Sequence, residues 1–250
     1  MGSNKGLQNE ALIAEYLDGK KYSEINANLQ TLIRDIFGAE KECSFIQSGV
    51  MDGPYKPDIF IRYKGQTKFL SIKHGRTNEV HHENIKKIIL FLRKYGVSKE
   101  TQKTILLYQY GDGTLNGTGE KRLDNMEVRM WLNKELQRAN DELNDNRELI
   151  NAFSERALFQ GIDETADHVD YIYFGSPEYG KVVSKKQIMK YIDVKSWHFM
   201  QCLHIGPIFL KPHARYANRE ILTPEFRERV DCSWPNLAND LDFIAKRFTF

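Results

Sequence analysis

The sequence is poor in cysteine and has no long apolar run. Its three cysteines, Cys43, Cys202 and Cys232, lie far apart and form no CxxC pattern, which argues against a disulfide scaffold or a zinc ribbon and suggests a reducing compartment. The longest apolar run, residues 88–92, falls far short of the roughly 20 residues that span a membrane. The first ten residues contain no apolar stretch typical of a signal peptide. We therefore expect a cytoplasmic protein without a membrane partner.

The charge is nearly balanced overall but is unevenly distributed. The 250 residues carry a net charge of +2, with 41% hydrophobic and 28% charged residues, a composition typical of a globular chain with one large domain. Residues 62–103 contain eleven basic and three acidic residues, residues 120–167 contain seven and twelve, and residues 181–229 contain ten and four. Two basic stretches around an acidic one fit a polyanion-binding surface, although a solvated face explains each run equally well.

Hydrophobic periodicity divides the first 110 residues into helices and strands. Apolar residues at helical spacing predict helices over residues 7–19, 23–38 and 78–95. Alternating or continuous apolar runs predict strands over residues 43–48, 57–63, 67–73 and 104–110, the second and third forming a hairpin around Lys64-Gly65-Gln66. The order helix, strand, strand, strand, helix, strand predicts an α/β (α+β) fold with a mixed central sheet flanked by helices.

The remainder of the chain is expected to add helices and strands to this core. Residues 122–160 are typical of two helices broken near residues 144–146. Further strands are expected over residues 169–174, 197–200 and 203–211, and helices over 184–192 and 237–248. We expect residues 1–115 to form the core and residues 116–250 to form a helical insertion and C-terminal extension, within one compact domain.

Three polar side chains of different chemistry are expected to meet at one end of the hairpin. Side chains alternate across a strand, so Ser71 and Lys73 share a face, and ordinary hairpin register places Asp58 beside them. A carboxylate there can hold Mg²⁺, which polarises a phosphate and lowers the pKa of a bound water, while a lysine stabilises the developing charge. The trio therefore predicts phosphodiester hydrolysis. The structural alternative is that Asp58 merely begins a strand and Lys73 is a solvated strand-end lysine.

Pro57-Asp58, twelve intervening residues and Ser71-Ile72-Lys73 resemble the motif of the PD-(D/E)xK nucleases, the restriction-endonuclease-like superfamily. The resemblance covers roughly residues 1–110 and implies an αβββαβ core. A chain of this size is most similar to a type II restriction endonuclease. The resemblance therefore implies an endonuclease that depends on Mg²⁺, with Mn²⁺ as a substitute, and that cuts double-stranded DNA as a homodimer in a bacterial, archaeal or phage-infected cytoplasm, without a nucleotide cofactor.

The same resemblance assigns roles within the motif. Asp58 is expected to bind the metal, and Lys73 to be the catalytic lysine. The backbone carbonyl of Ile72 is expected to be a further metal ligand. Ser71 stands where most members have a second acid, and it is expected to line the site.

A glutamate from elsewhere must then supply the missing carboxylate. In a subgroup with the same change it comes from the following helix, for which Glu83 is the first choice and Glu79 the second. Lys5-Gly6-x-x-x-Glu10 is also similar to the start of archaeal Holliday-junction resolvases, where the glutamate helps bind metal. Glu10 is therefore expected to be an auxiliary acid, with Glu15 and Glu24 as alternatives.

Basic, histidine and amide side chains in two regions are expected to contact DNA. They are Arg62, His74 and Arg76 around the motif, and Lys211, His213, Arg215, Asn218 and Arg219 after the last strands. Arginine reads guanine and asparagine reads adenine in the major groove. The alternative for the second group is a solvated loop that touches only phosphates or nothing.

Two other functions remain open. The first is a Holliday-junction, repair or phage nuclease of the same fold. The second is a catalytically inactive descendant that binds nucleic acid, for which Ser71 in place of the acid is the supporting feature.

Overall fold

The computed structural model of the protein describes residues 5–38, 44–53, 56–75, 78–119, 121–162, 167–199, 202–213 and 223–248. The chain forms two compact units built from alternating segments. Unit 1 comprises Met1–Asn78, Leu158–Tyr191 and Asn236–Phe250, and unit 2 comprises Glu79–Ala157 and Ile192–Pro235. The expected boundary near residue 115 matches neither unit, because the chain leaves unit 1 after residue 78 and returns to it twice. Within the described ranges, no helix has both the length and the apolar character needed to span a bilayer.

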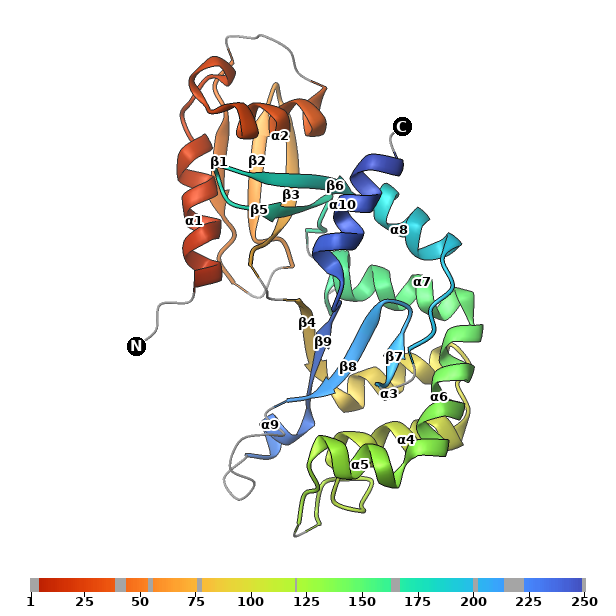
Figure 1. Cartoon of the computed structure of the whole chain (residues 1–250). Coiled ribbons are helices and arrows are strands. Elements are labelled where there is room, and N and C mark those ends of the chain that lie inside the picture. The colour runs from red at the N-terminus through yellow and green to blue at the C-terminus, as the bar shows by residue number, and fades with distance from the viewer. Residues whose placement is uncertain are drawn as a thin grey trace. The chain divides into compact units, whose positions relative to one another are not determined.

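Unit 1 contains a five-stranded mixed sheet flanked by helices (Figure 1). The strand order is β1-β2-β3-β5-β6, in which β3 and β5 are parallel and the other neighbours are antiparallel. Its elements are α1 (Lys5–Leu17), η1 (Tyr22–Glu24), α2 (Ala27–Phe37), β1 (Gln47–Val50), β2 (Ile59–Tyr63), β3 (Gln66–Lys73), β5 (Tyr171–Gly175), β6 (Gly180–Ser184), α8 (Lys185–Val194, whose last three residues belong to unit 2) and α10 (Leu237–Arg247).

The two faces of this sheet have different roles. Strand alternation directs apolar side chains of β2, β3 and β5 to one face, where they form the core with apolar stripes of α1 and α2. These residues are Ile59, Ile61, Tyr63, Leu70, Ile72 and Tyr173 of the strands and Ile13, Ala14, Leu17, Leu29, Leu32, Ile33 and Ile36 of the helices. The opposite face carries Ser71 and Lys73, and α10 packs against β6. Ser71 and Lys73 thus lie on the face away from α1 and α2, whereas Gln66 and Lys68, nearer the turn of the hairpin, lie on the other face.

Unit 2 contains a four-stranded antiparallel sheet with helices around it. The strand order is β4-β9-β8-β7. Its elements are β4 (Glu79–Asn84), α3 (Ile85–Lys94), α4 (Lys99–Tyr110), α5 (Asn125–Trp131), α6 (Asn133–Asp145), α7 (Arg147–Glu155), the π-helical turn η2 (Arg156–Gln160, shared with unit 1), β7 (His204–Ile205), β8 (Ile208–Pro212), α9 (Pro224–Glu228) and β9 (Arg229–Ser233).

The strand expected over residues 104–110 is wrong, because this segment is the second half of α4. Ser98 caps the helix by accepting a hydrogen bond from the backbone N–H of Thr101, and Gly111 ends it in the left-handed conformation with φ 62°. Thr101, Ile105 and Tyr108 are buried at helical spacing. The cap residues and this spacing outweigh the β-propensity of the TILLYQY run. The strand that pairs in parallel with β3 is instead β5, about 100 residues further along the chain.

The helix expected over residues 78–95 begins later than its pattern suggested. Residues 79–84 form β4, which pairs with β9 through a β-bulge between Glu79 and His81. The helix α3 starts at Ile85, with the side chain of Asn84 accepting a hydrogen bond from the backbone N–H of Lys86. The start of the expected helix is thus a strand, because the conformation of residues 79–84 depends on pairing with β9, which is distant in the sequence.

Most other expected elements are present with shifted ends. The expected hairpin is β2 and β3, and the expected helix break lies at Asn146, between α6 and α7. The segments over 169–174, 184–192 and 237–248 correspond to β5, α8 and α10. Residues 203–211 form the hairpin of β7 and β8 rather than one strand, with Gly206 at φ 56° in the turn. Residues 197–199 form no strand.

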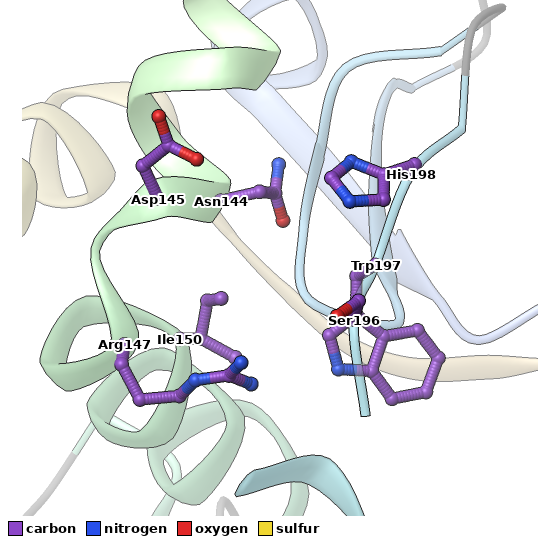
Figure 2. Close-up of a pocket in the computed structure, with 7 residues that line it drawn as sticks. All are labelled: Asn144, Asp145, Arg147, Ile150, Ser196, Trp197 and His198. Carbon is purple, nitrogen blue, oxygen red and sulfur yellow. The ribbon is translucent and has the colours of Figure 1, made fainter. Parts of the chain in front are cut away.

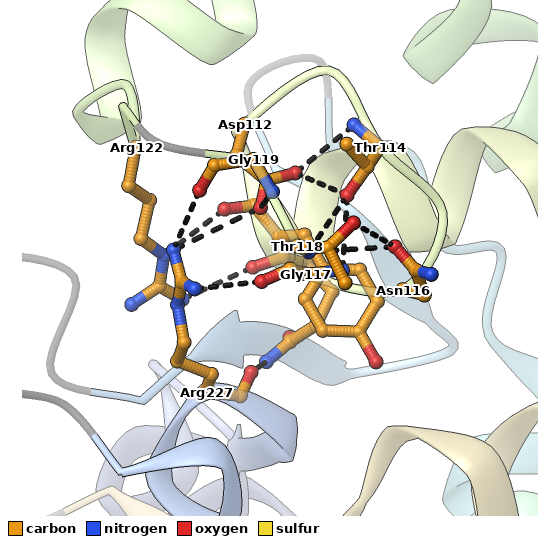
Figure 3. Close-up of polar contacts among 10 residues, drawn as sticks. Asp112, Thr114, Asn116, Gly117, Thr118, Gly119, Arg122 and Arg227 are labelled. Atoms are coloured by element: carbon orange, nitrogen blue, oxygen red, sulfur yellow. Dashed lines mark hydrogen bonds and ion pairs between the residues drawn. The ribbon is translucent and has the colours of Figure 1, made fainter.

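A glycine-rich loop of unit 2, residues 111–119, is held closed by Asp112 and Arg227 (Figure 3). Asp112 Oδ1 accepts hydrogen bonds from the backbone N–H (3.0 Å) and hydroxyl (2.8 Å) of Thr114, and Oδ2 accepts one from Gly119 N (3.0 Å). Arg227 donates to the carbonyls of Gly117 (2.6 Å) and Gly119 (3.4 Å) and lies 3.8 Å from Asp112 Oδ2. The loop is therefore ordered around one buried carboxylate.

Arg122 connects this loop to the end of α4. Its Nε and one terminal nitrogen donate to the carbonyls of Tyr110 and Gln109, both at 3.1 Å, which satisfies the last turn of the helix. Burial, and then the positive charge of Arg227, lower the pKa of Arg122, while Asp112 opposes both effects. Asp112 thus balances two arginines in a region with little access to water.

We predict that Asp112→Ala destabilises the protein by about 2–4 kcal/mol, because it removes three hydrogen bonds and leaves Arg122 and Arg227 without their buried counter-charge. Chemical denaturation measures the change. The control is Asn116→Ala in the same loop. Its exposed side chain accepts hydrogen bonds from Thr118, and we expect its loss to cost less than about 1 kcal/mol. Equal losses in the two variants would contradict this account of the loop.

Candidate active site

The carboxylate of Asp58 is held by three consecutive residues of β3. The backbone N–H of Asp58 donates to Leu70 O at 2.8 Å, which extends the hairpin by one residue and places Asp58 opposite Ser71. Asp58 Oδ2 then accepts hydrogen bonds from Ser71 Oγ (2.9 Å), the backbone N–H of Ile72 (2.6 Å) and Lys73 Nζ (3.3 Å). Within the described ranges no donor contacts the second oxygen, Oδ1. One oxygen is thus fixed by the protein, and the other contacts no donor in the described part of the chain.

Lys73 is positioned by two acceptors at the end of β3. Its Nζ donates to Asp58 Oδ2 and also to the backbone carbonyl of Ile72 at 3.2 Å. The side chain of Lys73 is 17% exposed and that of Asp58 is 23% exposed, so this ion pair lies at the protein surface with access to solvent. The structure therefore brings together Asp58, Ser71 and Lys73, as their spacing in the sequence predicted.

Glu10 of α1 interacts electrostatically with Asp58 and Lys73. Burial is the main cause that raises the pKa of Glu10, and the negative charge of Asp58 raises it further, while the charge of Lys73 lowers it. Glu10 therefore lies within electrostatic reach of both residues, although it is remote from them in sequence. Its neighbour Asn9 is buried and donates from Nδ2 to Gly175 O at 2.8 Å, which fixes this turn of α1 against the end of β5.

The oxygens of this cluster fit a hard divalent cation. Burial raises the pKa of Glu10 most, and the negative charge of Asp58 raises it further; a cation bound between the two carboxylates would relieve that repulsion. In the described part of the chain, no group of three His, Cys, Asp or Glu side chains could hold a metal ion. Mg²⁺ is commonly held by one or two carboxylates and keeps several waters, so Glu10, Asp58 and the Ile72 carbonyl would be a sufficient donor set.

Glu83 does not lie on a helix, and its carboxylate already has partners. It is in β4 of unit 2, fully buried, and accepts hydrogen bonds from Arg156 at 2.5 and 3.1 Å and a contact from His81 Nε2 at 3.3 Å. Burial alone would raise the pKa of Glu83, but hydrogen bonds from His81 and Arg156 and their charges outweigh it, so the pKa lies below its usual value. The structure therefore places Glu83 in a buried ion pair with Arg156 of the same unit.

Glu79, the second choice, also belongs to unit 2. It is half-exposed at the start of β4, 3.4 Å from Arg229 and 3.9 Å from His82. The expectation that Glu79 and Glu83 lie on a helix is wrong, because both are residues of β4, one exposed and the other buried. Glu10 is a glutamate of unit 1 whose pKa is raised by burial and, in addition, by the charge of Asp58. The alternatives Glu15 and Glu24 are exposed, and the side chain of Glu24 is used in the cap of η1.

The expected DNA-contacting residues lie in both units. Arg62 is exposed on β2, on the same sheet face as Asp58, and donates from Nε to Thr67 Oγ1 at 3.0 Å. His74 follows β3 directly and is partly buried. In unit 2, Lys211 is exposed on β8, and His213 Nδ1 lies 2.7 Å from Asp231 Oδ2. Arg76, Arg215, Asn218 and Arg219 lie outside the described residues.

One functional candidate was missed by the sequence reasoning. The strand β6 was not expected, and it places Lys181 in the same sheet as Lys73 through the intervening Phe174 of β5. The signal was present in the turn residues Pro177-Glu178-Tyr179-Gly180 between two runs rich in β-branched and aromatic residues.

A separate pocket of about 190 Å³ lies within unit 2 (Figure 2). It is lined by Asn144, Asp145, Arg147, Ile150, Ser196, Trp197 and His198. Three of these side chains form hydrogen bonds with the backbone. Arg147 donates to the carbonyls of Ile192 and Lys195, and Trp197 Nε1 donates to Ile192 O. The amide of Asn144 donates to two backbone carbonyls through Nδ2 and accepts from a backbone N–H through Oδ1. These polar groups serve the junction of α6 and α7 with the segment that follows α8.

We predict that Glu83→Gln lowers the free energy of unfolding at pH 7 by about 3 kcal/mol, because it removes the buried carboxylate that pairs with the partly buried Arg156. The folded-state pKa of Glu83 is depressed, so its contribution is present above the ordinary pKa of a glutamate and is lost as the pH falls through the folded value. Denaturation at pH 7 and below pH 4 checks this: the deficit of the variant should shrink in acid. Glu79→Gln on the same strand is the control, and an equal loss there would contradict the prediction.

Neither a scan of protein-family models nor a search of curated proteins finds a match to this chain. The geometry of Asp58, Ser71, Lys73 and Glu10 is therefore the basis for assigning a function.

Proposed function

We propose that the protein is a Mg²⁺-dependent endonuclease that hydrolyses phosphodiester bonds in double-stranded DNA, of the type II restriction class within the PD-(D/E)xK nucleases. The observation that carries the proposal is the convergence of Ser71, Ile72 and Lys73 on one oxygen of Asp58, with the other oxygen facing no protein donor in the described chain. A structural ion pair would not require three donors on one oxygen at the exposed end of a sheet.

The topology of unit 1 supports the same proposal. α1 precedes three antiparallel strands, and a strand parallel to the third completes the centre of the sheet. This order is similar to the αβββαβ core of the resembled family, with most of unit 2 inserted between β3 and β5. The catalytic motif of that family lies on the second and third strands of the core; here Asp58 directly precedes β2 and Lys73 ends β3.

Each residue then has a defined task. Asp58 Oδ1 and Glu10 would hold the cation, with the Ile72 carbonyl as a third oxygen, and Ser71 orients Asp58 by its hydrogen bond to Oδ2. When bound, Mg²⁺ would polarise the phosphate and supply an activated water. Lys73 presents an ammonium beside the same carboxylate, where it stabilises negative charge that develops on the phosphate or orients the nucleophilic water.

Ser71 is compatible with activity because Glu10 supplies the second carboxylate. With both carboxylates ionised, Lys73 offsets only one of the two negative charges. The negative charge that is left favours the binding of a divalent cation. The rival proposal, a descendant that binds DNA without cutting it, has the serine as its only support. A junction or repair nuclease of the same fold would use the same residues on a different DNA shape.

We predict that the native protein cuts long genomic DNA in the presence of Mg²⁺, and that Asp58→Asn and Lys73→Ala each reduce the rate by about 10²–10⁴-fold. Ser71→Ala should reduce it by no more than about tenfold, because Asp58 keeps two of its three donors. The matched control is Lys68→Ala, a lysine of the same strand on the opposite sheet face, which should cut like native protein.

Comparison of linear duplex, four-way junction and single-stranded substrates separates the rival nucleases. A homodimer is expected to cut both strands in one binding event, whereas a monomer with one site would release nicked plasmid first. Duplex binding without any cleavage by native protein would overturn the endonuclease proposal in favour of the binding descendant.

Metal binding gives a readout that does not depend on activity. We predict that Mg²⁺ raises the melting temperature of the native protein in the absence of DNA, and that the rise grows with Mg²⁺ concentration. At a concentration one hundred times Kd, the gain in the free energy of unfolding is about 2.7 kcal/mol. Asp58→Asn and Glu10→Gln should each weaken this response, whereas Glu15→Gln on the exposed side of α1 should not. A response that is the same in all four proteins would show that the cation binds elsewhere.

A further inference from the structure

A second lysine lies in the same cross-strand row as Lys73. The register pairs Lys73 with Phe174 of β5, and Phe174 with Lys181 of β6. Residues paired in this way point to the same face of a sheet, so Lys181 shares the face of Asp58 and Lys73. It is two strands away from Lys73, or about 10 Å.

Lys181 is part of a group of cations that outnumber their acids. Asp242 of α10 forms ion pairs with both Lys181 and Lys246, the second at 2.5 Å, so one carboxylate serves two lysines. Burial, and then the charge of Lys246, lower the pKa of Lys181. The other acid of this helix, Asp240, is buried and accepts a hydrogen bond from Tyr191 at 2.5 Å. With Arg247 in the last turn of α10, three cations lie against these two aspartates, so positive charge is in excess where β6 meets α10.

The end of α10 extends this group onto α8 (Figure 1). Gln187 donates from Nε2 to Phe248 O at 2.7 Å, and Lys190 Nζ lies 6.0 Å from the centre of the Phe248 ring. Lys186 and Lys190 are four residues apart and both exposed, so they share one face of α8. Arg247 lies over the Phe243 ring at 5.7 Å. Aromatic rings thus support two of the cations in defined positions.

We propose that this basic face, defined as Lys181, Lys186, Lys190, Lys246 and Arg247, binds backbone phosphates of duplex DNA beyond those at the Asp58 site. The inference rests on the proposed function, because it concerns the DNA that the site would cut. About 10 Å corresponds to about three base pairs along a duplex, so DNA held at Lys73 reaches Lys181 within that length.

Helix electrostatics do not account for the face. Cations near a helix C-terminus are favourable, which explains Lys246 and Arg247 in the last turn of α10. Lys186 lies at the opposite end of its helix, in the first turn of α8, where a cation is unfavourable. Lys181 is in a strand. A polyanion is the partner whose charge complements all five residues.

The test is the binding of a labelled duplex by Lys186→Gln/Lys190→Gln, measured by fluorescence anisotropy without divalent metal over a range of salt concentrations. We expect affinity at low salt to fall about tenfold, and the slope of log K against log salt to become less negative by about two, because each phosphate contact contributes about 0.9. Lys186→Arg/Lys190→Arg should bind like native protein, which separates loss of charge from loss of folding.

The matched control is Lys20→Gln/Lys64→Gln. Both lysines are exposed and lie at the end of the unit 1 sheet that carries the β2–β3 turn, away from Asp58. Equal losses in control and test variants, or an unchanged test variant when native protein binds and cuts DNA, would overturn the basic face alone. Failure of native protein to bind any duplex would overturn the proposed function together with it.

Discussion

The register of one hairpin determines whether the Asp58 cluster can exist. Oδ2 of Asp58 meets Ser71, Ile72 and Lys73 only when β2 and β3 pair Ile59 with Leu70. A shift of one residue would turn the side chains of one strand to the opposite face and direct its apolar residues towards the polar side. The buried face prevents this, because Ile59, Leu70 and their neighbours fill the core with α1 and α2. The apolar side of the hairpin thus sets the geometry of the polar side.

The parts of the fold that follow from local pattern were predictable. The hairpin is marked by two alternating runs around a short turn, and the spacing from Asp58 to Lys73 follows directly from its register. Residues 104–110 show the limit of this reasoning, because their strand-like composition competes with helix caps at Ser98 and Gly111. The true parallel partner of β3 follows an insertion of most of unit 2, and no local pattern identifies which later strand returns to the sheet.

The candidate site also has a part that follows from local sequence and a part that depends on tertiary structure. Asp58, Ser71 and Lys73 come from one hairpin and were found from their spacing, whereas the choice of glutamate depends on tertiary structure. Glu83 was expected on a helix that follows the hairpin. The segment instead pairs with β9 as a strand, and the Glu83 carboxylate forms an ion pair with Arg156. The ion pair between the partly buried Arg156 and the buried Glu83 joins segments more than 70 residues apart in the chain. Only packing reveals it, and the same is true of the approach of Glu10 to Asp58.

Under the proposed function, the charges on the unit 1 sheet must attract both a cation and a phosphate. Two carboxylates near each other favour a cation, yet they repel a phosphate of the DNA that the proposed site would cut. At 4 Å this repulsion is about 1 kcal/mol per pair of charges in water and rises as water is excluded. Under the proposed function, Lys73 and a bound divalent cation offset it at the centre, and the lysines of the basic face offset it further along the duplex. Carboxylates that hold a cation at the reacting phosphate therefore require further cations around them to offset their repulsion of the DNA.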